Sequence, residues 1–406
     1  MRSNKISIRP FLATILLLAT VSLAGFFELS VGAQQQNTQQ RPRRVNGGQP
    51  PTGASPSSAE EIDEGDVVRV DTQLVSVPAI VNTSDGRVLT DLRRENFVVY
   101  EDGQPQTLAN FGTTSTPFEI ALLLDTSGST REDVLLIRRA ANAFIDALRP
   151  GDRVAIEAFN TDNDGQAKIA TVEILTELTG DRKVLREAIE NVGTSNGTPF
   201  YDALERVATE VFREPAKEEM RGRRAVVALT DGVDSSSNTD YAQIKSSLLA
   251  AGVATYFIQV NTEDFVEDRL MKDCQDDGRL SLSQKQLERY RRIFVPAATR
   301  EDYADFCRMG PFERMSISRE LYNLARREMN DLARVTGGRT FNALTLQDAR
   351  TAFARVAAEI GTQYSLGYYP ANKARDGKFR SIKVEVRGIK DKTTVRAREG
   401  YYAETK

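Results

Sequence analysis

Between residues 115 and 361, apolar and polar positions follow two alternating patterns. Short and nearly continuous apolar runs, such as 120–124 and 225–229, are typical of buried strands. The segments between these runs repeat apolar residues every three or four positions, as in 132–148, which predicts amphipathic helices. Strands that alternate with helices predict an α/β domain with a doubly wound, mostly parallel sheet.

The patterns place each expected element along this domain. We expect strands at 118–125, 152–159, 169–175, 224–230, 253–260 and 339–341, and helices at 132–148, 182–191, 200–213, 240–251, 320–335 and 346–361. Residues 262–320 break the alternation, because they are highly charged and contain one helical stretch near 283–293. We interpret 262–320 as an insertion within the domain at 115–361.

Two segments that flank the α/β domain show strand patterns with turn signals. Asp85-Gly86 and Asp102-Gly103 are typical of tight turns between strands. Residues 66–114 and 362–406 are each too short to bury a stable core alone. We therefore expect the two segments to pair into one β-sandwich, so that the α/β domain is inserted within a β domain.

The N-terminal residues resemble an export signal. Three basic residues precede an apolar stretch at 11–27, and small residues end at Ala33. We expect a signal peptide at 1–33 that is cleaved after Ala33, which predicts a periplasmic or secreted protein. The alternative is that this segment is not cleaved and anchors the protein in the membrane; the membrane would then be contacted only through this segment. Residues 34–65 are rich in Gln, Pro, Gly and Ser, which predicts a disordered linker.

Composition excludes several functional classes. The chain contains no histidine, which excludes Ser-His-Asp and Cys-His catalysis and removes the commonest zinc, copper and iron ligand. A formal net charge of −3 gives no basic field for nucleic acid. The two cysteines, Cys274 and Cys307, are expected to form one disulfide in an oxidising compartment, and two free buried thiols are the alternative.

Oxygen-bearing side chains cluster after two of the expected buried strands and in one loop. Asp125 ends the strand expected at 118–125, and Ser127 and Ser129 follow it. Asp231 follows the strand at 224–230, and Thr198 lies in a loop before a helix. The carboxyl ends of parallel strands are where α/β sheets bind ligands, and oxygen ligands suit a hard cation such as Mg²⁺.

Each of these signals has a simpler explanation. Asp125, Ser127 and Thr198 are residue types that cap helices, and an aspartate followed by glycine after a strand is often only a turn. Asp234 and the serines that follow it are expected to be solvated loop. The three elements in this order, each in its expected structural context, nevertheless indicate one metal site.

The constellation resembles the metal-ion-dependent adhesion site of the von Willebrand factor type A domain, over residues 115–361. The resemblance implies direct coordination by Ser127, Ser129 and Thr198, with Asp125 and Asp231 acting mostly through water. It implies Mg²⁺, or Mn²⁺ or Ca²⁺, with one position open for a partner's carboxylate. The export signal, the strand at 99–103 and the tyrosine-rich segments at 363–370 and 398–402 are similar to a bacterial exported subgroup.

We therefore expect a binding module, and not an enzyme, that captures a protein or peptide presenting Asp or Glu. One alternative is a structural component of the cell envelope in which the metal site is not essential. Another is a Mg²⁺-dependent phosphoryl-transfer hydrolase, which would require a second aspartate where this chain has Ser127.

Overall fold

The computed structural model describes residues 74–128, 134–163, 168–214, 222–272 and 282–405. These lie in one compact unit, Arg69–Lys406. The expected signal peptide at 1–33, the linker at 34–65, Ser129 and Cys274 lie outside the described residues, so the signal peptide, the linker and the Cys274–Cys307 disulfide stay predictions. No helix within the described ranges is long and apolar enough to cross a membrane.

A six-stranded sheet forms the centre of the α/β domain. Its strand order is β10-β9-β8-β5-β6-β7, and every neighbouring pair is parallel except the antiparallel pair of β6 and β7 at one edge. The strands are β5 (Glu119–Leu124), β6 (Arg153–Asn163), β7 (Lys168–Thr179), β8 (Arg224–Thr230), β9 (Ala254–Val260) and β10 (Arg339–Ala343). β5 and β8 are buried at every residue, as their unbroken apolar runs predict.

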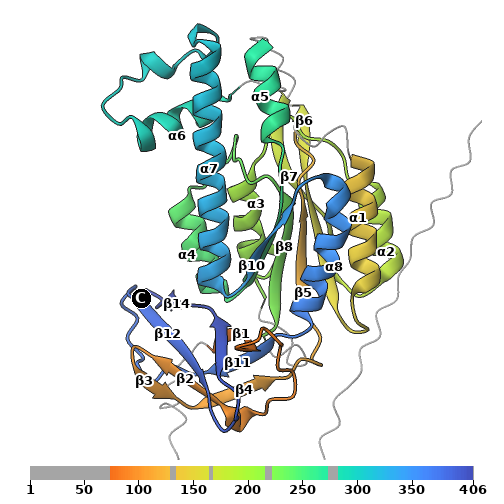
Figure 1. Ribbon diagram of the computed structural model, residues 1–406, viewed down its shortest axis with the longest axis vertical. Helices are drawn as coiled ribbons and strands as arrows, with labels where there is room; N and C mark the ends of the chain where they lie inside the picture. Colours follow the sequence, from red (N-terminus) through yellow and green to blue (C-terminus); the bar gives the residue numbers. More distant parts are fainter. Residues whose placement is uncertain (1–73, 129–133, 164–167, 215–221, 273–281, 406) are drawn as a thin grey trace, which may run out of the picture. The chain divides into compact units, whose positions relative to one another are not determined.

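Helices cover both faces of this sheet (Figure 1). One face packs against α1 (Val134–Ala147), α2 (Arg182–Glu190) and α8 (Ala349–Ile360), which follows a short turn of helix, η8 (Leu346–Asp348). The other face packs against α3 (Phe200–Arg206), its π-helical continuation η4 (Val207–Val211), α4 (Tyr241–Ala251) and α7 (Pro311–Thr336). Alternate residues of the central strands enter opposite cores, which confirms the predicted doubly wound fold.

The segments on either side of the α/β domain pair with each other. One four-stranded sheet has the order β13-β1-β11-β4 and the other β14-β12-β2-β3, so each contains strands from both ends of the described chain. The strands are β1 (Val75–Thr83), β2 (Phe97–Glu101), β3 (Gln104–Gln106), β4 (Leu108–Gly112), β11 (Tyr364–Tyr368), β12 (Phe379–Val386), β13 (Thr393–Ala397) and β14 (Gly400–Tyr402). Their inward side chains form one shared apolar core, as expected for a sandwich built from two incomplete halves. A short helical turn, η2 (Arg94–Asn96), precedes β2.

The structure corrects the predicted limits of the insertion at 262–320. The helix expected at 320–335 already begins at Pro311, which follows the N-cap Gly310 and is suited to the first helical position. Its first half packs through Ile317 and Leu321 onto α5 (Glu263–Lys272), which the sequence did not predict, and α6 (Gln284–Phe294). The inserted chain therefore has a small apolar core of its own, completed by the short turns η6 (Glu301–Tyr303) and η7 (Phe306–Arg308).

Candidate metal centre

Two of the predicted ligands follow neighbouring central strands. Asp125 comes directly after β5 and Asp231 directly after β8, and these strands are adjacent in the sheet. The Asp125 amide donates to the Leu229 carbonyl (3.0 Å), and the Thr230 hydroxyl donates to Asp125 Oδ2 (2.6 Å). The ends of the two strands are thus joined by backbone and side-chain hydrogen bonds.

The loop that carries Thr198 is joined to both strand ends. The Ser195 amide donates to the Thr126 carbonyl at 2.9 Å. On the other side, the Thr198 amide donates to Ser235 Oγ (2.8 Å) and the Ser235 amide donates to the Thr198 carbonyl (3.0 Å). The three loops therefore form a closed ring of hydrogen bonds at the C-terminal edge of the sheet.

The centre of this ring is acidic and shielded from water. Asp125 is fully buried, and Ser127, Thr198 and Asp231 are each less than a tenth exposed. Burial, together with the nearby charge of Asp231, raises the pKa of Asp125 to about 7, although hydrogen bonds from Ser127 and Thr230 oppose this shift. Two buried carboxyl groups that repel each other, surrounded by hydroxyls, are an oxygen donor set that fits a hard divalent cation.

The described part of the centre thus brings Asp125, Ser127, Thr198 and Asp231 together, while Ser129 lies outside the described residues. Their role as ligands stays a prediction. Among the residues that the structure describes, no group of three or more acidic or cysteine side chains could hold a metal. A cation here would consequently depend on the serine and threonine hydroxyls as well as on the two aspartates.

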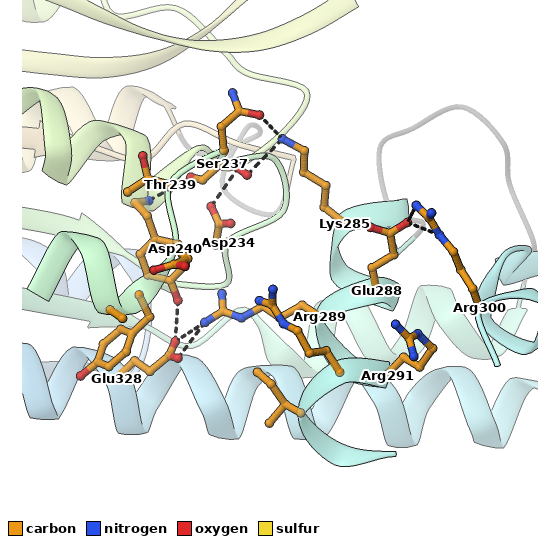
Figure 2. Close-up of a pocket in the computed structure, with 16 residues that line it drawn as sticks. Asp234, Ser237, Thr239, Asp240, Lys285, Glu288, Arg289, Arg291, Arg300 and Glu328 are labelled. Atoms are coloured by element: carbon orange, nitrogen blue, oxygen red, sulfur yellow. Dashed lines mark hydrogen bonds and ion pairs between the residues drawn. The ribbon is translucent and has the colours of Figure 1, made fainter. Parts of the chain in front are cut away.

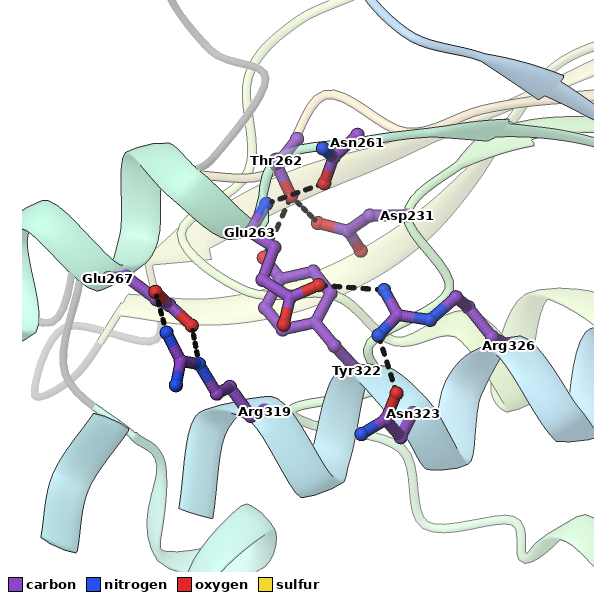
Figure 3. A network of polar contacts seen from close by, with 9 residues as sticks. All are labelled: Asp231, Asn261, Thr262, Glu263, Glu267, Arg319, Tyr322, Asn323 and Arg326. Atoms are coloured by element: carbon purple, nitrogen blue, oxygen red, sulfur yellow. Dashed lines mark hydrogen bonds and ion pairs between the residues drawn. The ribbon is translucent and has the colours of Figure 1, made fainter. Parts of the chain in front are cut away.

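Sequence reasoning missed two residues that hold Asp231 in place (Figure 3). The Thr262 hydroxyl, just after β9, donates to Asp231 Oδ2 at 2.6 Å and lies 2.7 Å from the Tyr322 hydroxyl of α7. The other carboxylate oxygen of Asp231 accepts from the Val233 amide (3.0 Å). Thr262 could have been found, because it follows a third central strand at the same edge; Tyr322 carries no such signal.

Further contacts link α5, which follows Thr262 directly, to α7, which carries Tyr322. Arg326 of α7 pairs with Glu263 of α5 at 2.8 Å, and Arg319 of α7 forms a two-pronged pair with Glu267 of α5 (Figure 3). Bidentate pairs of arginine and carboxylate fix geometry as well as charge. The inserted chain is therefore held to α7 by several separate polar contacts beside the carboxylate of the candidate centre.

Asp234 and the following serines, which we expect to be solvated loop and not ligands, form a loop that is only partly solvated: 234–236 are half-buried and Ser237 is buried. Asp234 Oδ1 accepts from the Phe200 amide (3.1 Å), and Ser237 Oγ accepts from the Tyr201 amide (3.0 Å) at the start of α3. Asp202 in turn accepts from the Thr239 amide (2.8 Å). The loop after Asp231 is thus folded onto the N-terminus of α3, where free amides need acceptors.

Replacing Thr262 with valine is expected to destabilise the protein by about 1–3 kcal/mol, because a buried carboxylate oxygen and a tyrosine hydroxyl both lose a hydrogen-bond partner. Urea unfolding followed by circular dichroism measures the change. Thr351→Val on α8, at an exposed position, is the matched control and should leave the unfolding midpoint unchanged. Equal midpoints for the two variants would contradict the role given to Thr262.

A comparison with known protein families finds a match in the α/β domain. Residues 119–285 match the family model of the von Willebrand factor type A domain. The match contains β5, β8 and the three loops described above. The chain therefore contains a von Willebrand factor type A domain.

Several solved structures are similar to the chain. Proximal thread matrix protein 1 from the mussel byssus is 13% identical, with 60% of this chain and 48% of that chain covered and a TM-score of 0.37. A von Willebrand factor type A protein from Catenulispora acidiphila is 12% identical, with coverages of 82% and 75% and a TM-score of 0.39. The conserved hypothetical protein BatB from Bacteroides thetaiotaomicron is 15% identical, with coverages of 60% and 98% and a TM-score of 0.34.

The chain spans about half the length of the mussel protein. A comparison with curated proteins gave no match.

Proposed function

We propose that this protein is an exported binding module that holds a divalent cation and captures a protein partner through one of the partner's carboxylates. The observation that carries the proposal is the ring of three hydrogen-bonded loops around the buried Asp125 and Asp231. The ring lies within the matched von Willebrand factor type A domain. Export rests on the pattern of the first 33 residues alone.

The donor set supports binding and not catalysis. Ser127, Thr198 and the predicted Ser129 are neutral ligands, so two aspartates supply all the negative charge around the cation. Such a cation stays electrophilic and gains a strong ligand when a partner's Asp or Glu completes its coordination. In addition, Ser127 stands where a phosphoryl-transfer hydrolase of the kind considered above would need a second aspartate.

The choice of cation follows from ligand chemistry. Carboxylate and hydroxyl oxygens favour Mg²⁺, Mn²⁺ and Ca²⁺ over softer metals. Mg²⁺ is our first assignment, because a small octahedral ion that keeps several waters suits a site with few charged ligands.

Metal binding and carboxylate capture are tested in one titration series. In the first titration, Mn²⁺ is added to the full chain and the free ion is measured by electron paramagnetic resonance. In the second, the full chain is added to a fluorescein-labelled peptide of ten glutamates, in Mg²⁺ or in chelator, and the fluorescence anisotropy of the peptide is followed. We expect one Mn²⁺ ion to bind and Mg²⁺ to displace it. We also expect chelator to weaken peptide binding at least about tenfold, because losing the bond between the cation and the peptide's carboxylate should cost at least about 1.4 kcal/mol.

Asp231→Asn should weaken both Mn²⁺ and peptide binding. Asp181→Asn is the matched control: it makes the same charge change at the N-cap of α2, where asparagine caps as well as aspartate. Failure of the unaltered protein to bind Mn²⁺ at millimolar concentration, or equal affinities in the two variants, would refute the proposed metal centre.

A further inference from the structure

A polar cavity of about 730 Å³ shares a loop with the candidate metal centre. Asp234 and Ser237, whose hydrogen bonds fix the loop after Asp231 to α3, also line this cavity. Its other walls are the start of α4, the length of α6 and Glu328 of α7 (Figure 2). The cavity is therefore built partly from the inserted chain.

The N-terminus of α6 is held directly against the shared loop. The Ser283 hydroxyl, which caps α6, donates to the Ser235 carbonyl at 2.6 Å. Lys285 Nζ donates to the carbonyls of Ser236 (2.6 Å) and Ser237 (3.0 Å) and to the side chain of Asn238 (2.9 Å). Because all three donors of the ammonium group are used within the protein, Lys285 fixes the helix and adds positive charge beside the cavity.

The acidic groups of the cavity already have partners. Glu328 accepts two hydrogen bonds from Arg289, at 2.7 and 2.6 Å, and Glu288 accepts from Arg300 at 3.1 Å (Figure 2). Asp240 caps α4 by accepting from the Gln243 amide (2.9 Å). Asp234 Oδ1 accepts from the Phe200 amide (3.1 Å) and the Ser237 amide (3.3 Å), so this carboxylate too is held within the protein.

Two arginines of the cavity, in contrast, form no salt bridge with a carboxylate among the described residues, although the charge of Arg291 also acts on Glu288. Arg291 donates to the Ala298 carbonyl at 3.2 Å, and its buried Nε has no hydrogen-bond partner. Arg292 lines the same cavity at an exposed position. Arg292 is exposed and Arg291 is half-buried, so both guanidinium groups border the cavity without a salt bridge, and arginine binds carboxylates in a bidentate geometry.

We propose that this cavity is a second anchor, in which Arg291 and Arg292 bind an acidic side chain of the same partner segment that gives a carboxylate to the metal. The inference rests on the proposed function and names the partner's chemistry: a stretch of protein with at least two Asp or Glu residues. The loop after Asp231 borders both sites, which is why the proposal assigns both contacts to one extended segment of the partner. The second anchor adds affinity by making the second contact intramolecular.

The test uses the full chain and the labelled ten-glutamate peptide, titrated with Mg²⁺ and with chelator at two salt concentrations. Arg291→Gln/Arg292→Gln should weaken peptide binding about tenfold in Mg²⁺, and should abolish the salt-sensitive binding that remains with chelator. Arg350→Gln/Arg355→Gln is the matched control, because it makes the same charge change at exposed positions of α8. This control should bind like the unaltered protein. Circular dichroism checks that both variants are folded.

The outcomes separate the two proposals. Equal affinities for the two double variants, or no peptide binding by the unaltered protein, would overturn the second anchor. If the cavity variant weakens binding while chelator has no effect, the arginine site stands and the metal-dependent function fails. If chelator weakens binding while the cavity variant does not, the metal site stands alone.

Discussion

Replacing Gly338 with alanine is expected to destabilise the folded protein by more than about 3 kcal/mol, because the added methyl group would overlap a neighbouring strand. A Cβ atom at this position would lie 1.9 Å from the carbonyl oxygen of Thr255 and 2.9 Å from its amide nitrogen. Both are backbone atoms at the start of β9, so no side-chain rotation relieves the clash. The strand β10, which pairs with β9 from Arg339 onward, would have to move away.

Urea unfolding followed by circular dichroism measures this effect. Gly180→Ala is the control, since the nearest atom to its added Cβ is the Asp152 carbonyl oxygen at 3.6 Å, an ordinary contact. We expect the control to unfold within about 1 kcal/mol of the unaltered protein. A Gly338→Ala variant that unfolds together with the control would show that β9 and β10 are not packed as described.

This glycine illustrates what the sequence could and could not predict about the fold. Gly337-Gly338 predicts a helix end, and α7 does end there, with Gly337 in the left-handed conformation at a φ of 84°. The helix stop is a local property of the chain. The close approach of Gly338 to Thr255 depends on two segments far apart in sequence, and no local pattern carries that information.

The same difference between local patterns and long-range contacts explains which residues of the candidate site could be predicted from the sequence. Asp125, Thr198 and Asp231 could be brought together from sequence, because each follows a recognisable strand or precedes a recognisable helix, and parallel strands share one edge. Tyr322 could not, although it lies within the helix expected at 320–335, because it reaches Asp231 only through Thr262, a contact between segments far apart in sequence. Because α7 has many charged residues on its surface, the apolar pattern of its buried positions is not recognisable in the sequence, and the helix is not predicted to begin as early as Pro311.

Glu157 is a second residue whose burial could not be predicted from the sequence. It lies in β6 within a stretch predicted as strand, but the side chain is fully buried and neither carboxylate oxygen has a hydrogen-bond partner. Burial raises the pKa of Glu157 from 4.5 to about 8; the positive charge of Arg206 opposes this shift, and the negative charge of Glu210 adds to it. Arg206 is itself paired with Glu210 at 2.7 Å, so it neutralises Glu157 only in part.

Glu157→Gln is therefore expected to stabilise the protein at alkaline pH and to change its stability much less at pH 4.5. The unfolded chain releases the Glu157 proton near pH 4.5, whereas the folded protein keeps it until about pH 8. The stability of the unaltered protein consequently falls as pH rises between these values, and levels off above pH 8. At about 1.4 kcal/mol for each pH unit, the gap between variant and unaltered protein grows by an amount on the order of 5 kcal/mol.

Urea unfolding at pH 5, 7 and 9 follows this gap. Glu177→Gln on β7 is the matched control, because Glu177 is exposed and forms no side-chain ion pair with any described residue. Its unfolding free energy should track that of the unaltered protein at all three pH values. A Glu157→Gln gap that stays constant from pH 5 to pH 9 would mean that Glu157 is ionised in the folded protein throughout, and that water or a counter-charge reaches the strand at this point. A widening gap would show that the central sheet contains a neutral carboxylic acid at physiological pH, retained at a cost to stability that grows with every rise in pH up to about 8.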